Sequence, residues 1–307
     1  MTDPTIATAR TSRRPSLLEG GWSWLADPRL GAAAAFALWL AVVVLSSPIG
    51  RPLGTGQEAL AYWSAQLADP YANSEWTIPP GYVYSPAFLL LVSPLKWLPW
   101  VAFMGAWTAI LLVALRTLTG GRWFLLGVLA ATMEIAGGNI SLLLGLAIVV
   151  GFRWPAAWAF VLLTKITPGV GLLWFVVRRE WRSLGIALGA TALIVAGSAV
   201  LMPGAWLEWM DVLVRASGYS ATSAAVPIPF IVRFPIAVVL VVWGARTDRR
   251  WTVPVASMLA LPALWYGSLT MLLAVIPLLD GVRDGRPPAR AGEHREHEAS
   301  GEAAATA

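Results

Sequence analysis

The sequence contains no cysteine, so no disulfide can contribute to its fold. Charged residues are also scarce. They make up 13% of the chain, whereas a soluble domain usually carries about 25%. So few charges cannot cover the surface of a globular protein with polar groups. The sequence also lacks a Gly-rich phosphate loop, which argues against a nucleotide site. The small net charge of +5 lies mainly in short loops and the N-terminal tail. That pattern reports membrane orientation rather than binding to nucleic acid.

Hydrophobic residues are abundant and make up 57% of the 307 residues. A helix that spans a bilayer needs about 20 mostly apolar residues. The stretches 30–50 and 183–207 meet that length without a single charge. Lipid contact along most of the chain explains this composition. We therefore predict an integral membrane protein, placed in the plasma membrane.

The apolar runs predict an all-α, polytopic transmembrane bundle of about nine helices. A basic tail at 1–29 and a polar tail at 281–307 are expected to be disordered, with the transmembrane domain at 30–280 between them. Spans are expected at about 30–49, 85–98, 100–118, 122–136, 139–152, 154–177, 183–203, 227–245 and 254–279. The last of these has an alternative, in which 251–280 forms two short helices.

Arginine clusters predict the orientation, because Lys and Arg gather in cytoplasmic loops. The clusters are Arg178, Arg179 and Arg182, and Arg246, Arg249 and Arg250. With nine spans they place the N-terminus in the cytoplasm and the segments 50–84 and 204–226 outside. Arg116 and Arg122, together with the basic C-terminal tail, conflict with this arrangement.

The external segment 50–84 is unusually long for a loop between spans, and such loops often carry function. It is rich in acidic and aromatic side chains, which include Glu58, Tyr62, Trp63, Asp69 and Tyr84. An acid in an external loop is most often a solvated surface group. The aromatic surroundings give Glu58 more weight as a functional candidate.

Three of the charged residues inside predicted spans look buried, namely Glu134, Lys165 and Arg233. A charge at the centre of the bilayer costs about 2.5 to 3.5 kcal/mol. Lys165 lies beside Pro168 and Gly169, which interrupt the helix and make room, so we interpret it as a phosphate partner facing a cavity. The alternative is that Lys165 pairs structurally with Glu134 or extends to the interface. For Glu134, a functional role and structural pairing are equally supported. Arg233 lies close enough to the external surface to reach it.

Four short motifs resemble glycosyltransferase family 87, a family of polytopic enzymes in the glycosyltransferase-C superfamily. In the external segment, an acid at 58 is followed by Tyr62 and then by Tyr71. Tyr84-Ser85-Pro86 is similar to the family's entrance to the second span. Gly138-Asn139-Ile140-Ser141 looks like the family's Gly-Gln-x-Asn. Lys165-Ile166-Thr167-Pro168, with the basic stretch after it, is similar to the family's Lys-x-x-Pro.

The resemblance implies a sugar transfer from a polyprenyl-phosphate donor, outside the membrane, to a glycolipid or polysaccharide acceptor. It implies inversion at the anomeric carbon, with an external-loop carboxylate as general base, here Glu58. The expected substrate-binding residues are Tyr62, Trp63, Tyr84, Asn139, Lys165 and Arg233, with Asp69 and Glu134 as possible additions. The transferred unit would be mannose or arabinofuranose. No metal or cofactor is required by this chemistry.

Two departures from the family pattern keep other hypotheses open. Glutamate stands at 58 where the family has aspartate, and Gly267 stands where the family often has histidine. Together with the short C-terminal part, they favour as an alternative an inactive homologue that binds lipid or serves as an assembly subunit of envelope biogenesis. A transporter or flippase ranks third, because few polar residues occur in the spans and no internal repeat is found.

Overall fold

A computed structural model describes residues 26–47, 54–72, 74, 81–217 and 228–283 of the chain. These residues form helices and no strand, which confirms the predicted all-α class. Three helices are long and apolar enough to cross a membrane: α2 (Pro28–Leu45), α5 (Trp100–Thr119) and α11 (Trp181–Leu201). Each coincides with a predicted span. The other six predicted spans are not confirmed by helix length.

Several predicted spans are divided into short helical pieces. Residues 122–136 form α6 (Phe124–Ala130) and α7 (Thr132–Gly137), which join at Ala131. Residues 154–177 form the 3₁₀ helix η3 (Pro155–Ala157), α9 (Trp158–Thr164), the 3₁₀ helix η4 (Thr167–Leu172) and α10 (Leu173–Val177). Proline begins η3 and is the second residue of η4. Because proline lacks an N–H, it cannot continue a helix begun before it.

The C-terminal region is also broken. Its helices are α13 (Phe230–Arg246), α14 (Thr252–Leu259), η5 (Gly267–Ala274) and α15 (Val275–Arg283). The residues 260–266 separate α14 from η5, so 251–280 consists of two helical parts, as the alternative for this segment predicted. The segment 204–226, predicted as an external loop, instead contains the helix α12 (Pro203–Ser217). Residues 218–227 of that segment lie outside the described part of the chain.

The termini of the helical region differ slightly from the predicted boundaries. Helix α2 begins at Pro28, and the Asp27 side chain accepts a hydrogen bond from the backbone N–H of Arg29. A carboxylate at this position satisfies a free N–H of the first helical turn. Helix α15 extends to Arg283. The predicted disorder of the tails concerns residues that lie almost entirely outside the described ranges.

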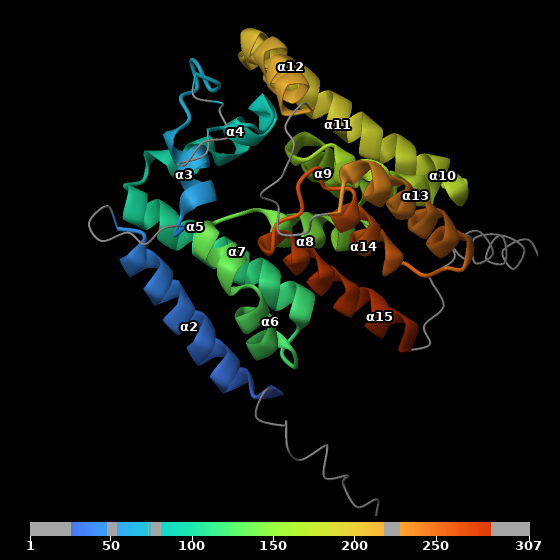
Figure 1. Cartoon of the computed structure of the whole chain (residues 1–307), viewed down its shortest axis with the longest axis horizontal. Coiled ribbons are helices and arrows are strands. Elements are labelled where there is room, and N and C mark those ends of the chain that lie inside the picture. The colour runs from blue at the N-terminus through green and yellow to red at the C-terminus, as the bar shows by residue number, and fades with distance from the viewer. Residues whose placement is uncertain (1–25, 48–53, 73, 75–80, 218–227, 284–307) are drawn as a thin grey trace, which may run out of the picture.

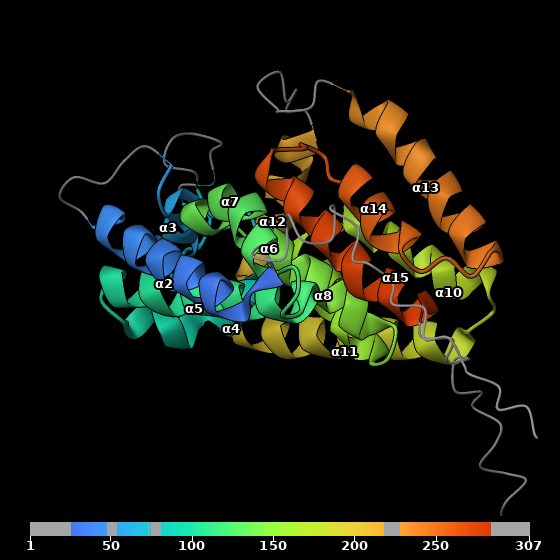
Figure 2. The same ribbon diagram turned by 90° about the horizontal axis from the view of Figure 1, so that it is seen from below.

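Helix α8 (Ser141–Gly151) lies at the centre of the bundle (Figures 1 and 2). It packs against α5 on one side and against α9 and η5 on the other. Helices α2, α5 and α6 form one group, while α10, α13 and α14 form a second. A helix that must pack on both groups has few positions for polar residues, which explains why its sequence is almost wholly apolar.

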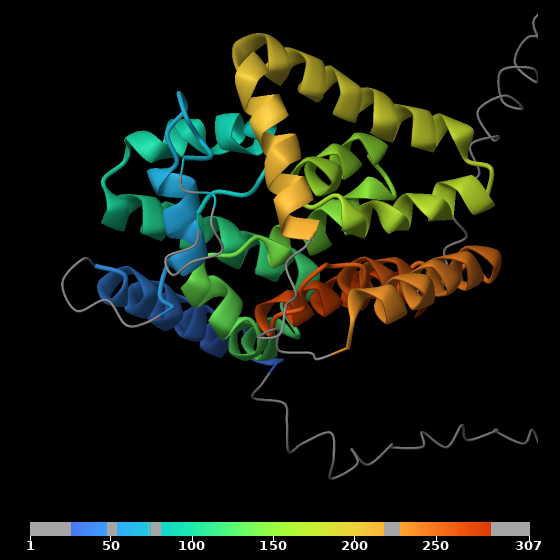
Figure 3. The same cartoon turned by 45° about the horizontal axis from the view of Figure 1, so that its top comes forward.

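Helices α11 and α12 meet at one edge of the molecule, with α12 reaching back over α4 (Pro86–Val92) (Figure 3). Only 11% of the apolar stretch of α11 is buried within the protein. Leu193 is 75% exposed and Val200 is 83% exposed. An exposed surface this apolar is stable in lipid, which supports the assignment of α11 as a span.

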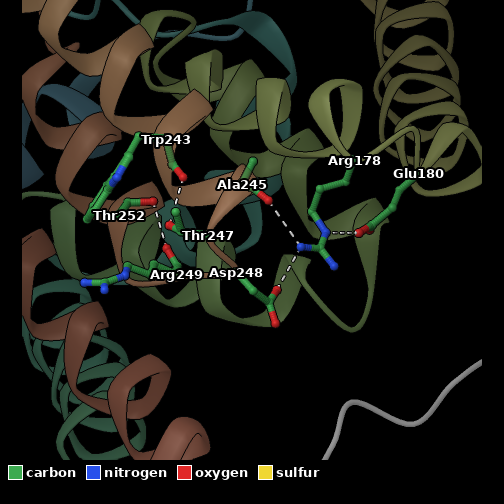
Figure 4. A network of polar contacts seen from close by, with 8 residues as sticks. All are labelled: Arg178, Glu180, Trp243, Ala245, Thr247, Asp248, Arg249 and Thr252. Atoms are coloured by element: carbon green, nitrogen blue, oxygen red, sulfur yellow. Dashed lines mark hydrogen bonds and ion pairs between the residues drawn. The ribbon is translucent and has the colours of Figure 1, made fainter.

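Arg178 joins two turns at one end of the bundle (Figure 4). Its guanidinium group binds Glu180 at 2.8 Å and Asp248 at 2.9 Å, and it also donates to the carbonyl oxygen of Ala245. Arg179 and Asp248 both have positive φ angles, 59° and 55°. The contact fixes the α10–α11 turn against the α13–α14 turn. These are the turns at which the two arginine clusters used to predict orientation are found.

Candidate active site

Glu58 lies on a short helix inside the segment predicted as an external loop. This helix, α3 (Gln57–Ser64), places Glu58 in its first turn. Its neighbours Ala59 and Tyr62 are fully buried, so one face of α3 belongs to the core of the bundle. Glu58 itself is partly exposed. Helix α3 therefore anchors the acid in a fixed position against the bundle.

The junction between α7 and α8 holds the start of α3. The N–H of Gly56 donates to the carbonyl oxygen of Ala136 at 2.6 Å. Gly138 ends α7 with a φ angle of 73°, in the left-handed region that favours glycine. A Cβ atom at Gly138 would lie 2.5 Å from the Cβ atom of Ala59. Glycine thus allows α3 to pack directly on the junction.

Lys165 occupies the predicted helix break. Helix α9 ends at Thr164, and Lys165 has an extended backbone before η4 begins at Thr167. The hydroxyl group of Ser85 donates to the carbonyl oxygen of Leu163 at 2.5 Å. This bond ties the last turn of α9 to the segment that precedes α4. The predicted helix break beside Lys165 is confirmed, and Pro168 and Gly169 lie in the 3₁₀ helix that follows it.

Tyrosine side chains connect these two regions. Tyr62 on α3 donates its hydroxyl to that of Tyr84 at 3.2 Å, and Tyr71 donates to the backbone oxygen of Tyr84 at 2.7 Å. Tyr84 is adjacent to Ser85, which holds α9. A continuous set of contacts therefore extends from the helix that carries Glu58 to the break that carries Lys165.

Tyr62 and Tyr84 are both buried, with exposed fractions of 0% and 5%. The Tyr62 ring packs edge-on against Phe88 and at a tilt against Trp107. The resemblance implies that both tyrosines bind substrate, but in this conformation neither exposes a ring face. Both side chains belong to the buried core of the bundle.

Glu58 and Lys165 are the free charges of this region. In the described part of the chain, neither side chain has a hydrogen bond or an ion pair. Burial raises the pKa of the Glu58 carboxyl above its ordinary value, and the positive charge of Lys165 opposes that rise. Burial also raises the pKa of Tyr84, and the Glu58 charge raises it further. The acid and the cation therefore lie near enough for each charge to act on the other.

Glu134 lies on α7 and is 1% exposed. Its Oε1 atom accepts a hydrogen bond from the backbone N–H of Ser141 at 2.5 Å, at the start of α8. This N–H has no partner within its own helix, so the carboxylate acts as a cap and is favoured by the helix dipole. The charges of Lys165 and Glu58 both reach this carboxylate. Glu134 does not form an ion pair with Lys165, the structural alternative from the sequence.

Two further predicted residues form hydrogen bonds with backbone groups. Trp63, on α3, is partly exposed and donates its indole N–H to the carbonyl oxygen of Leu98 at 3.0 Å. The Oδ1 atom of Asn139 accepts from the N–H of Ile140 at 2.7 Å. That bond shapes the turn into α8. Asn139 therefore supports the junction that carries Glu134.

Arg233 is 3% exposed and binds backbone carbonyl groups. Its guanidinium donates four hydrogen bonds, at 2.7–2.8 Å, to Ile228, Leu259, Leu261 and Pro262. An arginine side chain has five N–H donors, so one is left over. The contacts hold the chain after α14, where the carbonyl groups would otherwise lack partners. The structure thus gives Arg233 a supporting role and does not place it with Glu58 and Lys165.

Asp69 lies apart from this group, at the rim of a cavity of about 210 Å³. The cavity is lined by Asp69, Tyr71, Ala72, Glu208, Asp211 and Arg215. Three of these residues come from α12, which the sequence interpretation had assigned to a loop. Arg215 also donates to the Ser74 hydroxyl at 3.1 Å. Only the amphipathic pattern of 203–217 gives a signal for this helix.

Two contributors to the site were not identified from the sequence. Gly138 belongs to one of the sequence motifs, but the motif does not indicate its structural role. Its left-handed backbone allows α3 to approach. Ser268, which follows Gly267, has a buried hydroxyl without a partner among the described residues. A single serine in an apolar stretch gives no sequence signal for such a position.

The chain matches glycosyltransferase family 87 over residues 82–277, which is more than half of its length. The match includes Tyr84, Glu134 and Lys165, while Glu58 on α3 precedes it. Comparison with curated proteins finds no match, and neither does comparison with solved structures. The family match agrees with the resemblance seen in the sequence motifs, and on this evidence the chain belongs to glycosyltransferase family 87.

Proposed function

We propose that this protein transfers a hexosyl or pentosyl unit, mannose or arabinofuranose, from a polyprenyl-phosphate donor to a cell-envelope glycan or glycolipid. Membership of the family implies glycosyltransferase activity. The donor, the acceptor and the outer face of the plasma membrane as the place of reaction are our inferences. They follow from the predicted orientation and from the chemistry of the site.

The relationship between Glu58 and Lys165 carries the proposal. A partly exposed acid and a cation, neither with a partner among the described residues, lie within electrostatic reach of each other. A general base needs an unoccupied carboxylate, and a phosphate leaving group needs a nearby positive charge. In this proposal Glu58 provides the base and Lys165 the positive charge.

In the proposed reaction, Glu58 removes the proton from an acceptor hydroxyl. The oxygen attacks the anomeric carbon, and the bond from that carbon to the phosphate oxygen breaks. The configuration is inverted, because attack and departure take place on opposite faces. Polyprenyl phosphate leaves with the bonding electron pair, and Lys165 stabilises its negative charge. No step requires a metal or a cofactor.

The surroundings of the site suit a lipid-linked donor. Helices α2 and α11 have apolar, mostly unburied surfaces, so the polyprenyl chain would remain in lipid while its phosphate reaches Lys165. Trp63 is partly exposed on the same helix as Glu58, and we propose that it stacks on a sugar ring. Tyr62, Tyr84 and Asn139 are proposed to hold the site in shape.

The test is transfer from polyprenyl-phosphate mannose or arabinose to an envelope glycolipid, in membranes that contain Glu58→Gln or Glu58→Asp. We expect Glu58→Gln to lower kcat by about 10²- to 10⁴-fold, the usual contribution of a general base, while donor binding is retained. Glu180→Gln, in the distant Arg178 contact, is the matched control. Full activity of Glu58→Gln would remove this residue as the base.

The same experiment separates the proposal from the inactive-homologue alternative. If the wild-type protein binds the donor but transfers sugar to none of the acceptors, the alternative of a lipid-binding or assembly subunit is favoured. If it transfers sugar and Glu58→Gln does not, the enzymatic proposal stands. Uptake of a solute by the protein in liposomes would instead favour the transporter.

A further inference from the structure

Glu134 has one carboxylate oxygen that the fold uses and one that it does not. Oε1 caps α8 through the Ser141 N–H, but Oε2 is buried and has no hydrogen-bond partner in the described part of the chain. Most buried polar atoms in proteins do have a partner, and a charged atom without one is especially costly. Capping α8 requires only one oxygen, so that role does not explain Oε2.

Gly267 faces this unused oxygen. A Cβ atom at Gly267 would lie 2.6 Å from Glu134 Oε2, and its next nearest atoms, at 3.7 and 3.8 Å, also belong to Glu134. Any side chain at this position would therefore have to displace the carboxylate. Glycine has no such side chain, so Oε2 remains where it is.

Serine hydroxyls occur on both sides of this contact. The Ser141 hydroxyl lies close enough to the Glu134 carboxylate to stabilise its charge, although neither this hydroxyl nor Oε2 makes a hydrogen bond of good geometry. Ser268 is 1% exposed, and its hydroxyl also has no partner among the described residues. Helix η5 packs against both α7 and α8, which brings Ser268 to the same junction. Polar atoms that lack partners thus gather where α7, α8 and η5 meet.

The charges of Glu58 and Lys165 both reach Glu134. In the proposed reaction these two groups act on the acceptor hydroxyl and on the phosphate, and the glycosyl unit lies between them. A sugar carries several O–H donors, whereas an ionised phosphate and a polyprenyl chain carry none. The group that most readily supplies a hydrogen-bond donor to Oε2 is therefore a sugar hydroxyl.

We propose that Glu134 Oε2 accepts a hydrogen bond from one hydroxyl of the transferred sugar, and that Glu134 and Gly267 together determine which sugar is accepted. This inference rests on the proposed function, because it concerns the sugar ring of the donor proposed there. It makes Glu134 a specificity residue of the donor site, in addition to its role as a cap. Sites built to bind a hydroxyl reject analogues that lack it, because their buried polar groups are then left unpaired.

The test measures binding by the full chain in lipid nanodiscs. The probes are polyprenyl-phosphate mannose or arabinose, whichever binds more tightly, its single-deoxy analogues, and sugar-free polyprenyl phosphate. For the wild-type protein we expect one deoxy analogue to bind about 10- to 100-fold more weakly, the range for a hydrogen bond to a charged group. We expect Glu134→Gln to weaken binding of the intact donor about tenfold and to leave binding of polyprenyl phosphate unchanged. In Glu134→Gln, the same deoxy analogue should bind as the intact donor does.

Two glycine substitutions test the same inference without changing a polar side chain. Gly267→Ala should displace the carboxylate and reproduce the loss seen with Glu134→Gln. Gly185→Ala is the matched control, because a Cβ atom there has no neighbour within 4 Å. Glu134→Gln retains an amide oxygen for the Ser141 N–H, so the cap is preserved in this variant.

Other outcomes separate the inference from the function on which it rests. If the effects of Glu134→Gln and of each missing hydroxyl simply multiply, Glu134 does not contact the sugar, although transfer that depends on Glu58 would still stand. If Glu134→Gln weakens polyprenyl phosphate equally, the residue acts on the phosphate or the fold, and the inference is wrong. If the wild-type protein neither distinguishes the donor from polyprenyl phosphate nor transfers sugar, both proposals are wrong.

Discussion

Trp107 on α5 donates its indole N–H to the carbonyl oxygen of Gly138, at 2.7 Å, across the junction between α7 and α8. Both Glu134 and the start of α3 depend on this junction, the first through Ser141 and the second through Ala136. One long, apolar helix therefore supports the broken segments that carry the candidate site. The broken segments themselves are too short to be stable without such contacts.

Trp107→Phe should lower stability without removing the aromatic packing. The phenyl ring still contacts Phe103, which stacks on Trp107 at 5.9 Å, but the buried Gly138 oxygen loses its donor. Such a loss costs about 1–3 kcal/mol. Thermal unfolding of the purified protein in detergent measures the effect. Trp97→Phe is the control, because Trp97 is 90% exposed. Equal melting temperatures for the two variants would show that this hydrogen bond does not support the junction.

Gly138→Ala should impair transfer more than Gly120→Ala. Both glycines have positive φ angles, 73° with ψ 28° at Gly138 and 62° with ψ −172° at Gly120, so both substitutions cost about 1–3 kcal/mol in backbone strain. At Gly120 a Cβ atom has no neighbour within 4 Å, whereas at Gly138 it would clash with Ala59 on α3. We expect an additional loss of about 1–3 kcal/mol and a lower transfer rate only for Gly138→Ala. Denaturation and transfer assays on both variants test this. Equal effects would mean that α3 does not pack as described.

The sequence predicts this architecture only in part, and the reasons are physical. The long uncharged run that became α11 was recognised because composition alone indicates a span. The break at Lys165 was recognised because proline cannot continue a helix. Helix α3 was missed, because its burial comes from tertiary contacts at Gly138 rather than from its own pattern. Helix α12 was missed because it is amphipathic, and its charged residues Glu208, Asp211 and Arg215 keep it from being recognised as a span.

The pH dependence of transfer should reflect the contact between Glu58 and Lys165. The base must be ionised, so activity is lost as pH falls through the pKa of Glu58. Burial raises that pKa above 4.5, and the Lys165 charge counteracts part of the rise. Lys165→Met removes the opposing charge, so the acid limb of kcat/KM should move to higher pH. Lys165→Arg should keep the limb near its wild-type position. An unchanged limb in Lys165→Met would mean that Lys165 does not act on Glu58.

Arg233→Lys should reduce stability and leave the KM for donor unchanged. Lysine cannot reproduce the planar set of donors that reaches Ile228, Leu259, Leu261 and Pro262. Buried carbonyl groups are then left without partners, at a cost of roughly 2 kcal/mol or more. Thermal unfolding and initial rates measure the two effects, with the exposed Arg182→Lys as control. A higher KM with normal stability would instead support the expectation from the sequence that Arg233 binds substrate.

The absence of cysteine allows the predicted orientation to be tested with single introduced cysteines. Ala72, beside the Asp69 cavity, and Thr247, beside the Arg178 contact (Figure 4), are both exposed. Because arginine-rich turns remain in the cytoplasm, Ala72→Cys should react with a membrane-impermeant maleimide in intact cells. Thr247→Cys should react only after the cells are permeabilised. The unmodified chain, which has no thiol, controls for background labelling. Labelling of Thr247→Cys in intact cells would show that the orientation is the reverse of the predicted one. Glu58 would then face the cytoplasm and would use donors found there.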